Sequence, residues 1–472
     1  MARSVARRER GLDDYFRISE RGSSLRTELI AGVTTFMTMA YILFVNPSVL
    51  TAIPDAEGTT LSPEAVLTVT ALAAGVASLA MGLYANYPFA IAAGLGLNAV
   101  VAFDLVGGDQ LTWPEAMGVI VVEGVIILLL VLTKFRQAVM ESVPLALKHS
   151  IAVGIGLFIA IIGFANGGIV TPGPEGGPLL QLGSAGQLRG WPVLVFVVGL
   201  LLIVFLYTRR IRGALLIGIL ATTVLAIIVN EAFLEGEGFG GAAKVGRVAD
   251  VPSGDSFSLI GDFSLGFFAE MGAVAAVLAI FSVMLSDFFD TMGTVVGLGR
   301  EAKLLDSEGR LPGMDRVLQV DSAAAALGGA FSASSNTTYI ESASGIADGG
   351  RTGLTSAVVG VLFLLSVFFA PLAGIIPSEA TAPALVVVGF LMMTNIREVA
   401  WTDLDVAIPA FLTMVIMPFT YSITNGIGAG FVTYVFIKLA RGRSSEIHPM
   451  MYVAAAAFLV YFGLFYVEDL LT

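Results

Sequence analysis

Long apolar runs separated by short polar segments dominate the chain. Most runs approach the ~20 residues that an α-helix needs to cross the hydrocarbon core of a bilayer, so the pattern predicts an all-α, polytopic membrane protein. Seven runs precede an acidic, glycine-rich segment at 231–265, and seven follow it. The runs lie at 28–50, 64–84, 88–105, 113–133, 148–167, 190–208 and 212–230, and then at 267–297, 316–331, 338–350, 352–376, 380–396, 404–420 and 424–440.

Basic residues occupy alternate connections between the runs. Cytoplasmic loops carry an excess of Lys and Arg, and residues 1–27 hold seven arginines, so we expect a cytoplasmic N-terminus in the plasma membrane. Because seven is odd, the second half enters the bilayer in the opposite orientation, which predicts an inverted-topology repeat. The expected inner loops contain Lys134, Arg136, Arg209, Arg210, Arg212, Arg300, Lys303, Arg310, Arg316, Arg351, Arg397, Lys438, Arg441 and Arg443.

The third run of each half is unusually rich in small and polar residues. It reads PFAIAAGLGLNAVVAF at 88–103 and FSASSNTTYIESASGIADGG at 331–350. Interrupted segments at matching positions of two repeats point to a binding site at the membrane midplane, so we predict half-helices at both. A further apolar run at 449–467 is long enough to span; whether it crosses the membrane is left open.

Composition supports the membrane assignment and narrows the chemistry. The chain is 56% hydrophobic and 13% charged, with a mean hydropathy of +0.87, whereas soluble domains are roughly 25% charged. It has no cysteine and two histidines, which excludes disulfides, thiolate metal sites and histidine-rich metal centres. We expect no metal, no cofactor and no nucleic-acid partner, and the lipid bilayer as the surroundings.

Two carboxylates stand inside the apolar run FSVMLSDFFDTMGTVVGLGR at 281–300. Helical spacing places Asp287, Asp290, Thr291 and Thr294 on one face. A charged group at the bilayer centre costs ~2.5–3.5 kcal/mol on insertion scales, so such residues normally face a protein interior or a water-filled path. We therefore assign Asp290 and Thr294 to substrate binding. The alternative is that one Asp only caps a helix or pairs structurally.

A binding site forms if the two broken segments meet beside this helix. Asn98 offers an amide that donates and accepts, whereas Asp290 and Glu341 only accept when ionised. This set suits a planar heterocycle with N–H donors and ring acceptors. Backbone N–H groups from Ser342 and Ala343 onward would complete the ligand's edge if they open a half-helix.

The same carboxylates are candidates for ion coupling. Burial disfavours the ionised form of a carboxyl, so we expect Asp290 and Glu341, with Asp287 in support, to bind a proton outside and release it inside. Sodium is the alternative ion, held by these oxygens together with unwound backbone carbonyls.

Several motifs together carry a family resemblance. The chain resembles the AzgA-like purine permeases of the nucleobase:cation symporter-2 family, which includes the xanthine/uracil permeases, from about residue 15 to residue 466. The motifs are ELIAGVTTFMTMAYILFVNP at 28–47, GLGLNA at 94–99, ALKHSIAVGIGLFIAIIG at 146–163, DFFDTMGT at 287–294, TTYIESASGIADGGRTGLT at 337–355, TAPALVVVGFLMM at 381–393 and PAFLTMVIMPFTYSITNGIGAGF at 409–431.

The resemblance implies two intertwined inverted repeats of seven segments, with half-helices and short strands at segments 3 and 10. It implies uptake of adenine, guanine or hypoxanthine, usually with protons, between a core and a gate domain that move by an elevator-like or rocking motion. The family's binding residues fall on Asn98, Asp290 and Glu341. The expected parts are a cytoplasmic segment 1–27, core 28–135 and 266–376, gate 143–232 and 379–440, an extracellular connection 231–265, and a C-terminal segment 441–472.

Other functions remain open. The same architecture suits another small solute or an anion, although carboxylates at the centre argue against an anion site. An intramembrane aspartyl protease needs two Asp residues on facing elements, whereas Asp287 and Asp290 share one turn and no GxGD is present. A passive channel is a third alternative. We expect no enzymatic activity, and whether the chain forms a homodimer is left open.

Overall fold

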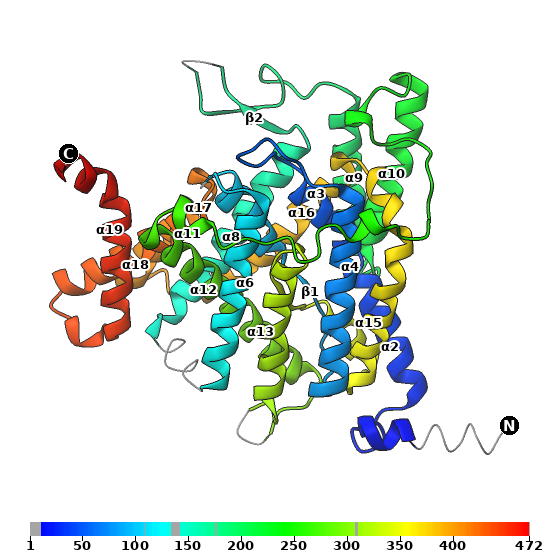
Figure 1. Cartoon of the computed structure of the whole chain (residues 1–472), viewed down its shortest axis with the longest axis horizontal. Helices are drawn as coiled ribbons and strands as arrows, with labels where there is room; N and C mark the ends of the chain where they lie inside the picture. Colours follow the sequence, from blue (N-terminus) through cyan, green and yellow to red (C-terminus); the bar gives the residue numbers. More distant parts are fainter. Residues whose placement is uncertain (1–10, 109, 134–141, 175–176, 307–309, 472) are drawn as a thin grey trace.

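The chain folds as a bundle of membrane-length helices (Figure 1). The structure, a computed structural model, describes residues 11–108, 110–133, 142–174, 177–306 and 310–471. Ten helices within these ranges are long and apolar enough to cross a membrane, which confirms the predicted polytopic all-α class. Several basic residues used above for orientation lie outside the described ranges, namely Arg3, Arg7, Arg8, Arg10, Lys134 and Arg136.

The helices of the first half coincide with the predicted runs. The side chains of Ser24 and Ser62 accept hydrogen bonds from the backbone N–H groups of Thr27 and Ala65, and so cap the first two spans. The elements are α2 (Leu25–Met39), α3 (Ile42–Leu50), α4 (Pro63–Ala80), η1 (Met81–Ala85), β1 (Ile91–Ala93), α5 (Leu95–Ala99), η2 (Val100–Val106), α6 (Trp113–Leu132), α8 (Leu145–Asn166), β2 (Val170–Pro172), β3 (Leu180–Leu182), α9 (Trp191–Thr208) and α10 (Ala214–Phe233).

The second half repeats the order after an irregular connection. The elements are η3 (Phe239–Gly241), η4 (Gly254–Phe257), α11 (Phe267–Glu270), α12 (Ala273–Glu301), α13 (Met314–Ala330), β4 (Asn336–Thr338), α14 (Ser342–Ala347), α15 (Gly353–Ser366), η5 (Val367–Gly374), α16 (Ser378–Met393), η6 (Thr394–Glu398), α17 (Leu404–Thr420), α18 (Ile423–Ala440), η7 (Ser444–Glu446) and α19 (Pro449–Leu471).

The two broken segments meet in a short antiparallel ribbon. Strand β1 pairs with β4, with Ala92 opposite Thr337. The pairing continues beyond the strands, because the Tyr339 N–H donates to the Ala90 carbonyl at 2.9 Å. Since the strands run in opposite directions, α5 and α14 leave the ribbon at opposite ends. This confirms the predicted half-helices with short strands at segments 3 and 10.

Helices from the two halves pack in two groups. Helix α8 packs mainly against α16 and α17, α9 packs against α10 and α16, and α17 packs against α18. In the other group α13 packs against α6, and α15 packs against α2 and α4. The assignment of residue ranges to gate and core stays a prediction.

Glycines allow helices of opposite halves to approach closely. A Cβ on Gly75 of α4 would lie 3.1 Å from the Gly360 carbonyl oxygen of α15, and one on Gly360 would lie 2.7 Å from the Gly75 oxygen. The same reciprocal contact joins Gly156 of α8 to Gly389 of α16. Small residues at such crossings permit the van der Waals packing that drives helix association in membranes.

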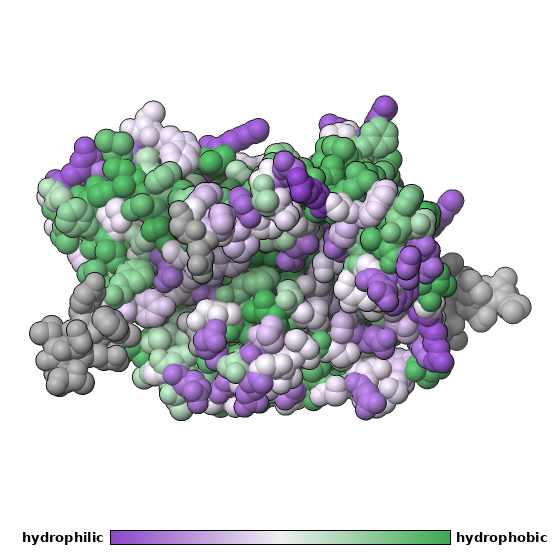
Figure 2. Space-filling model, turned by 90° about the horizontal axis from the view of Figure 1, so that it is seen from above, coloured by the Kyte–Doolittle hydropathy of each residue, from purple (hydrophilic) through white to green (hydrophobic). Residues whose placement is uncertain are grey.

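The connection at 231–265 crosses one end of the bundle. Its backbone donates hydrogen bonds to carbonyls of three other segments, from Asp250 to Phe368, from Gly261 to Ala330 and from Ser264 to Pro114. Figure 2 shows the molecule from above: hydrophobic residues gather over the upper left and upper right of this view, and hydrophilic residues are prominent along its lower and right edges.

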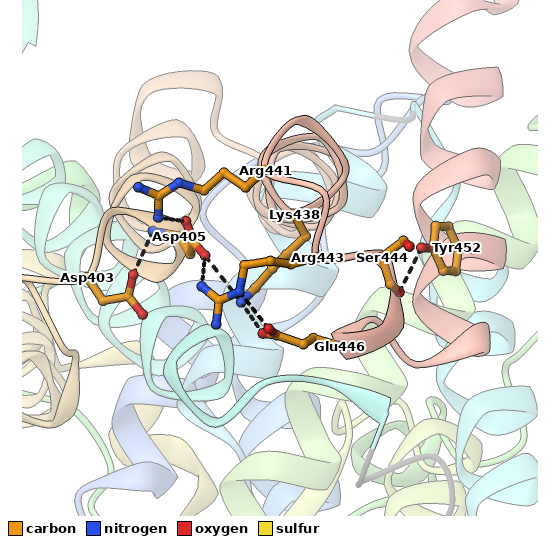
Figure 3. A network of polar contacts seen from close by, with 8 residues as sticks. All are labelled: Asp403, Asp405, Lys438, Arg441, Arg443, Ser444, Glu446 and Tyr452. Carbon is orange, nitrogen blue, oxygen red and sulfur yellow. Dashed lines mark hydrogen bonds and ion pairs between the residues drawn. The ribbon is translucent and has the colours of Figure 1, made fainter.

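An ion-pair network fastens the last helices (Figure 3). Asp405, at the start of α17, is fully buried and pairs with Arg441, Arg443 and Lys438 at the end of α18. Lys438 also pairs with Glu446 at 2.8 Å. Helix α19 then packs against α18 and α12.

Candidate functional site

The polar stripe on α12 divides between two environments. Asp287 and Thr291 are each 1% exposed, and Thr294 is also buried, whereas Asp290 is exposed. Thr291 donates to the Asp321 carboxylate at 2.7 Å and contacts the Thr337 hydroxyl of β4 at 2.8 Å. All four residues lie in the continuous helix α12, and Asp290 is the one of them that is exposed.

Glu341 lies at the N-terminal end of α14 and is half-buried. Its Oε1 accepts a 2.7 Å hydrogen bond from the hydroxyl of Tyr41, which lies where α2 meets α3. Asp290 interacts electrostatically with Glu341, and both interact with Tyr41 and Tyr339. The structure thus brings Asp290 and Glu341 together, with two phenol groups beside them.

Asn98 lies on α5 and is fully buried. Neither its Oδ1 nor its Nδ2 has a hydrogen-bond partner among the residues that the structure describes. An unsatisfied buried polar group costs about 1–3 kcal/mol, so this amide is available to a ligand, although it is closed to solvent in this conformation. Helix α5 contacts α12, the helix that carries Asp290.

The turn after Glu341 is already hydrogen-bonded within the chain. The N–H groups of Ser342 and Ala343 donate to the carbonyls of Tyr339 and Ile340, at 3.2 and 3.0 Å. The Ser342 hydroxyl is fully buried and accepts from the Ala90 N–H at 3.0 Å. Ser342 therefore stabilises the ribbon, and its use of these groups to bind a ligand stays a prediction.

Asp321 of α13 is a polar residue that sequence reasoning missed. Its Oδ1 accepts from the N–H and hydroxyl of Thr338 at 2.9 and 2.7 Å, and its Oδ2 accepts from Thr291 at 2.7 Å. Three donors on two oxygens fit an ionised carboxylate. Asp321 thereby ties α13 to both the ribbon and α12.

Two further residues of the region were also missed. Tyr41 stands in the motif ELIAGVTTFMTMAYILFVNP, where nothing in the sequence separates it from other aromatic residues. Glu123 is the only charged residue between Gly118 and Leu132. The cost of an intramembrane charge, applied to Asp287 and Asp290, would have identified Glu123 as well.

The arrangement presents mainly hydrogen-bond acceptors to a ligand. Ionised Asp290 and Glu341 only accept, and the free Asn98 amide does both. A ligand that donates N–H groups to both carboxylates, and that also donates a hydrogen bond to the Asn98 amide and accepts one from it, would satisfy all three side chains. A ligand that lacks these groups would cover the three side chains and leave their polar atoms unpaired, which is a strong basis for selection.

Comparison with known proteins places the chain among membrane permeases. Residues 26–465 match the family described as the Permease family, that of the xanthine/uracil permeases. Adenine permease AdeQ of Escherichia coli (strain K12) is 40% identical over 449 residues, which cover 95% of this chain and 95% of AdeQ. Guanine/hypoxanthine permease PbuG of Bacillus subtilis (strain 168) is 38% identical over 453 residues, which cover 95% of this chain and 98% of PbuG.

A solved structure shows the same fold. The transmembrane domain of a cyanobacterium bicarbonate transporter, BicA, matches with a TM-score of 0.59 over 86% of this chain and 97% of that domain. The sequence identity is 14%, so this likeness concerns the fold alone. It confirms the inverted-repeat transporter architecture.

Proposed function

Because the chain belongs to the Permease family over residues 26–465, and is therefore a transporter rather than an enzyme, we propose that it imports purine nucleobases in symport with protons. The observation that carries the proposal is identity of 38–40% along 95% of the chain to permeases named for adenine and for guanine and hypoxanthine. Its proposed substrates are these three purines.

The chemistry of the site supports a purine. Purines carry ring N–H donors and ring nitrogen acceptors in one plane, and Asp290 and Glu341 supply acceptors for the donors. Asn98, which has no partner in the described part of the chain, supplies a donor and an acceptor. We propose that Asp290, Glu341, Asn98 and Thr294 bind the purine, and that a proton accompanies it.

We propose that core and gate move against each other, and two polar contacts now join them. Arg212, at the start of α10, pairs with Asp348 at the end of α14, and Asp348 also accepts from Thr34 at 2.7 Å. Asp104 of η2 accepts from the N–H groups of Ile423 and Thr424 that open α18, at 3.0 and 3.2 Å. Both contacts join a proposed core segment to a proposed gate segment, so an elevator-like or rocking motion would break and remake them.

The membrane orientation follows from charge. We propose that the chain lies in the plasma membrane with its N-terminus in the cytoplasm, because the loops expected inside contain arginines such as Arg209, Arg210 and Arg351. Fluorescent labelling of single introduced cysteines tests this cleanly, since the chain has no native cysteine.

Uptake measurements test the proposed function. Cells expressing the chain should accumulate radiolabelled hypoxanthine, adenine and guanine should compete with it, and uracil should not. A protonophore should abolish accumulation, and removal of sodium at constant pH should not change it. Competition by bicarbonate or another anion instead of purines would contradict the proposal, and equal internal and external concentrations at steady state would indicate a channel.

A further inference from the structure

A buried carboxyl group outside the proposed binding site has no use in the mechanism so far. Glu123 of α6 is 0% exposed, and within the described residues no donor reaches either of its carboxyl oxygens. Removing one partner of a buried charge is strongly destabilising, so a charged Glu123 left in this state would be a severe defect. Among the described residues, Glu123 can be satisfied only if it or a neighbouring carboxyl group carries a proton.

The neighbours of Glu123 are themselves acidic. Asp287 of α12 lies within hydrogen-bonding reach of the Glu123 carboxyl, and Asp321 of α13 is the other charged group that interacts with it. All three are at most 3% exposed. Helix α6 packs against both α12 and α13 (Figure 1). Glu123 is therefore directed from a third helix at two carboxyl groups, with no cation among the groups that act on it.

Other titratable groups on the neighbouring elements have different partners or lie at the surface. Asp290, Arg300 and Glu301 of α12 and Asp315 and Arg316 of α13 are exposed. The others include Asp104 of η2, which caps α18; Glu270 of α11, which is exposed; Glu341 before α14, which binds Tyr41; Lys438 of α18, which pairs with Asp405; and His149 of α8, which interacts with Glu398 and Lys148.

The hydrogen bonds indicate which of the three carboxyl groups is ionised and which two share a proton. Asp321 accepts from three donors and is satisfied as an anion. Two ionised carboxylates cannot bond to each other, because each only accepts. One proton between Glu123 and Asp287 supplies the missing donor and removes one of two adjacent negative charges. Because Asp321 carries a third negative charge nearby, losing this proton is more costly still.

We propose that Glu123 and Asp287 share one proton in the membrane interior, and that this pair, in place of Asp290 and Glu341, is the proton-binding site of the transport cycle. The second part rests on the proposed purine symport. In the step itself no covalent bond between heavy atoms changes: a proton from the outer solution binds the pair, forms the hydrogen bond between the carboxyl groups, and is released to the inner solution.

The position of the pair explains how the proton and the purine are coupled. Asp287 lies one helical turn before Asp290 on α12. Its Oδ2 also accepts from the Ser335 hydroxyl at 3.4 Å, directly before β4. Loss of the shared proton places two charges between α6 and α12 and pushes these helices apart, which moves both Asp290 and the ribbon.

The test uses the full chain in proteoliposomes and the variant Glu123→Gln. The amide keeps the size of the side chain and still donates to Asp287, but it cannot exchange a proton. We expect Glu123→Gln to retain purine exchange at equal concentrations, and to lose both purine-driven proton uptake and accumulation driven by a proton gradient. Glu57→Gln, at an exposed loop position, is the matched control and should behave as the wild type.

A readout independent of transport detects the proton itself. The infrared C=O stretch of a protonated carboxyl group should be present in the wild type at neutral pH, shift in D2O, and disappear in Glu123→Gln. If Glu123→Gln does not insert into the membrane, Asp287→Asn should show the same loss.

Three results would overturn the proposal: an infrared band that is unchanged in both variants, purine-coupled proton uptake by Glu123→Gln at the wild-type ratio, or accumulation by the wild type that follows sodium at constant pH. If the wild type neither exchanges nor accumulates purines, the proposed function fails, and the infrared measurement still decides whether the pair holds a proton.

Discussion

The Tyr41 hydroxyl donates a 2.7 Å hydrogen bond to Oε1 of Glu341, so a residue of the first half fixes a carboxyl group of the second. Tyr41 is 1% exposed, whereas Glu341 is only half-buried. The bond therefore anchors the partly accessible carboxyl group to a rigid, buried side chain and leaves its second oxygen for a ligand.

Removing this anchor should weaken substrate binding. In Tyr41→Phe we expect the KM for purine uptake to rise roughly tenfold, because a hydrogen bond to a charged group is worth about 1.5–3 kcal/mol and only part of that is lost by misorientation. Tyr84→Phe is the matched control, since the Tyr84 hydroxyl binds Gln319 at an exposed position. Equal KM values in the two variants would show that Tyr41 does not position Glu341.

Neutralising either proposed binding carboxylate should stop transport without loss of protein. We expect Asp290→Asn and Glu341→Gln each to abolish accumulation of radiolabelled purine, because an amide presents an N–H group where the ligand needs an acceptor. Immunoblots of the membrane fraction check the amount of protein. Asp262→Asn and Glu270→Gln make the same changes at exposed positions and should transport normally. Normal accumulation by both binding-site variants would refute the assignment.

The buried network around Asp405 should be a main source of stability at one end of the bundle. Asp405→Asn leaves Arg441, Arg443 and Lys438 without their shared anion, and we expect a clear fall in the free energy of unfolding. Thermal unfolding in detergent measures it. Asp250→Asn removes a carboxylate from an exposed pair with Arg247 and should change little. A similar Tm for both variants would contradict the expected role of burial.

Glu446 should make stability depend on acidic pH. Hydrogen bonds from Arg443 and Lys438 lower the pKa of Glu446 below its ordinary value, and the pKa of a glutamate in an unfolded chain is about 4.3. Since the folded pKa is the lower one, the stabilisation is complete above the unfolded pKa and is lost as pH falls through the folded pKa. Between the folded and the unfolded pKa of this glutamate, the Tm of Glu446→Gln should vary less with pH than the Tm of the wild type. Parallel curves would exclude a contribution from Glu446.

The sequence was sufficient for the architecture because lipid imposes simple constraints. Helices must be long, apolar and internally hydrogen-bonded, so the runs at 113–133 and 190–208 correspond closely to α6 and α9. The odd number of runs in each half and the two polar third runs then indicated the inverted repeat and the broken helices.

The detailed contacts of the site were beyond sequence reasoning because they join distant segments. Tyr41 meets Glu341 across 300 positions, and Thr338 meets Asp321 through a ribbon whose register no local pattern fixes. Glu123 is a different case, because the sequence contains its signal, a lone charged residue in an apolar run.

The ribbon formed by β1 and β4 has a consequence for biogenesis and ancestry. One strand precedes the connection at 231–265 and the other follows it, so a first half that has left the ribosome carries an open strand edge, with no lipid group able to satisfy it. The central region must therefore be completed late, once residues 336–338 are synthesised. A single ancestral repeat would have had the same open strand edge. It could have paired that edge only with a copy of itself inserted in the opposite direction.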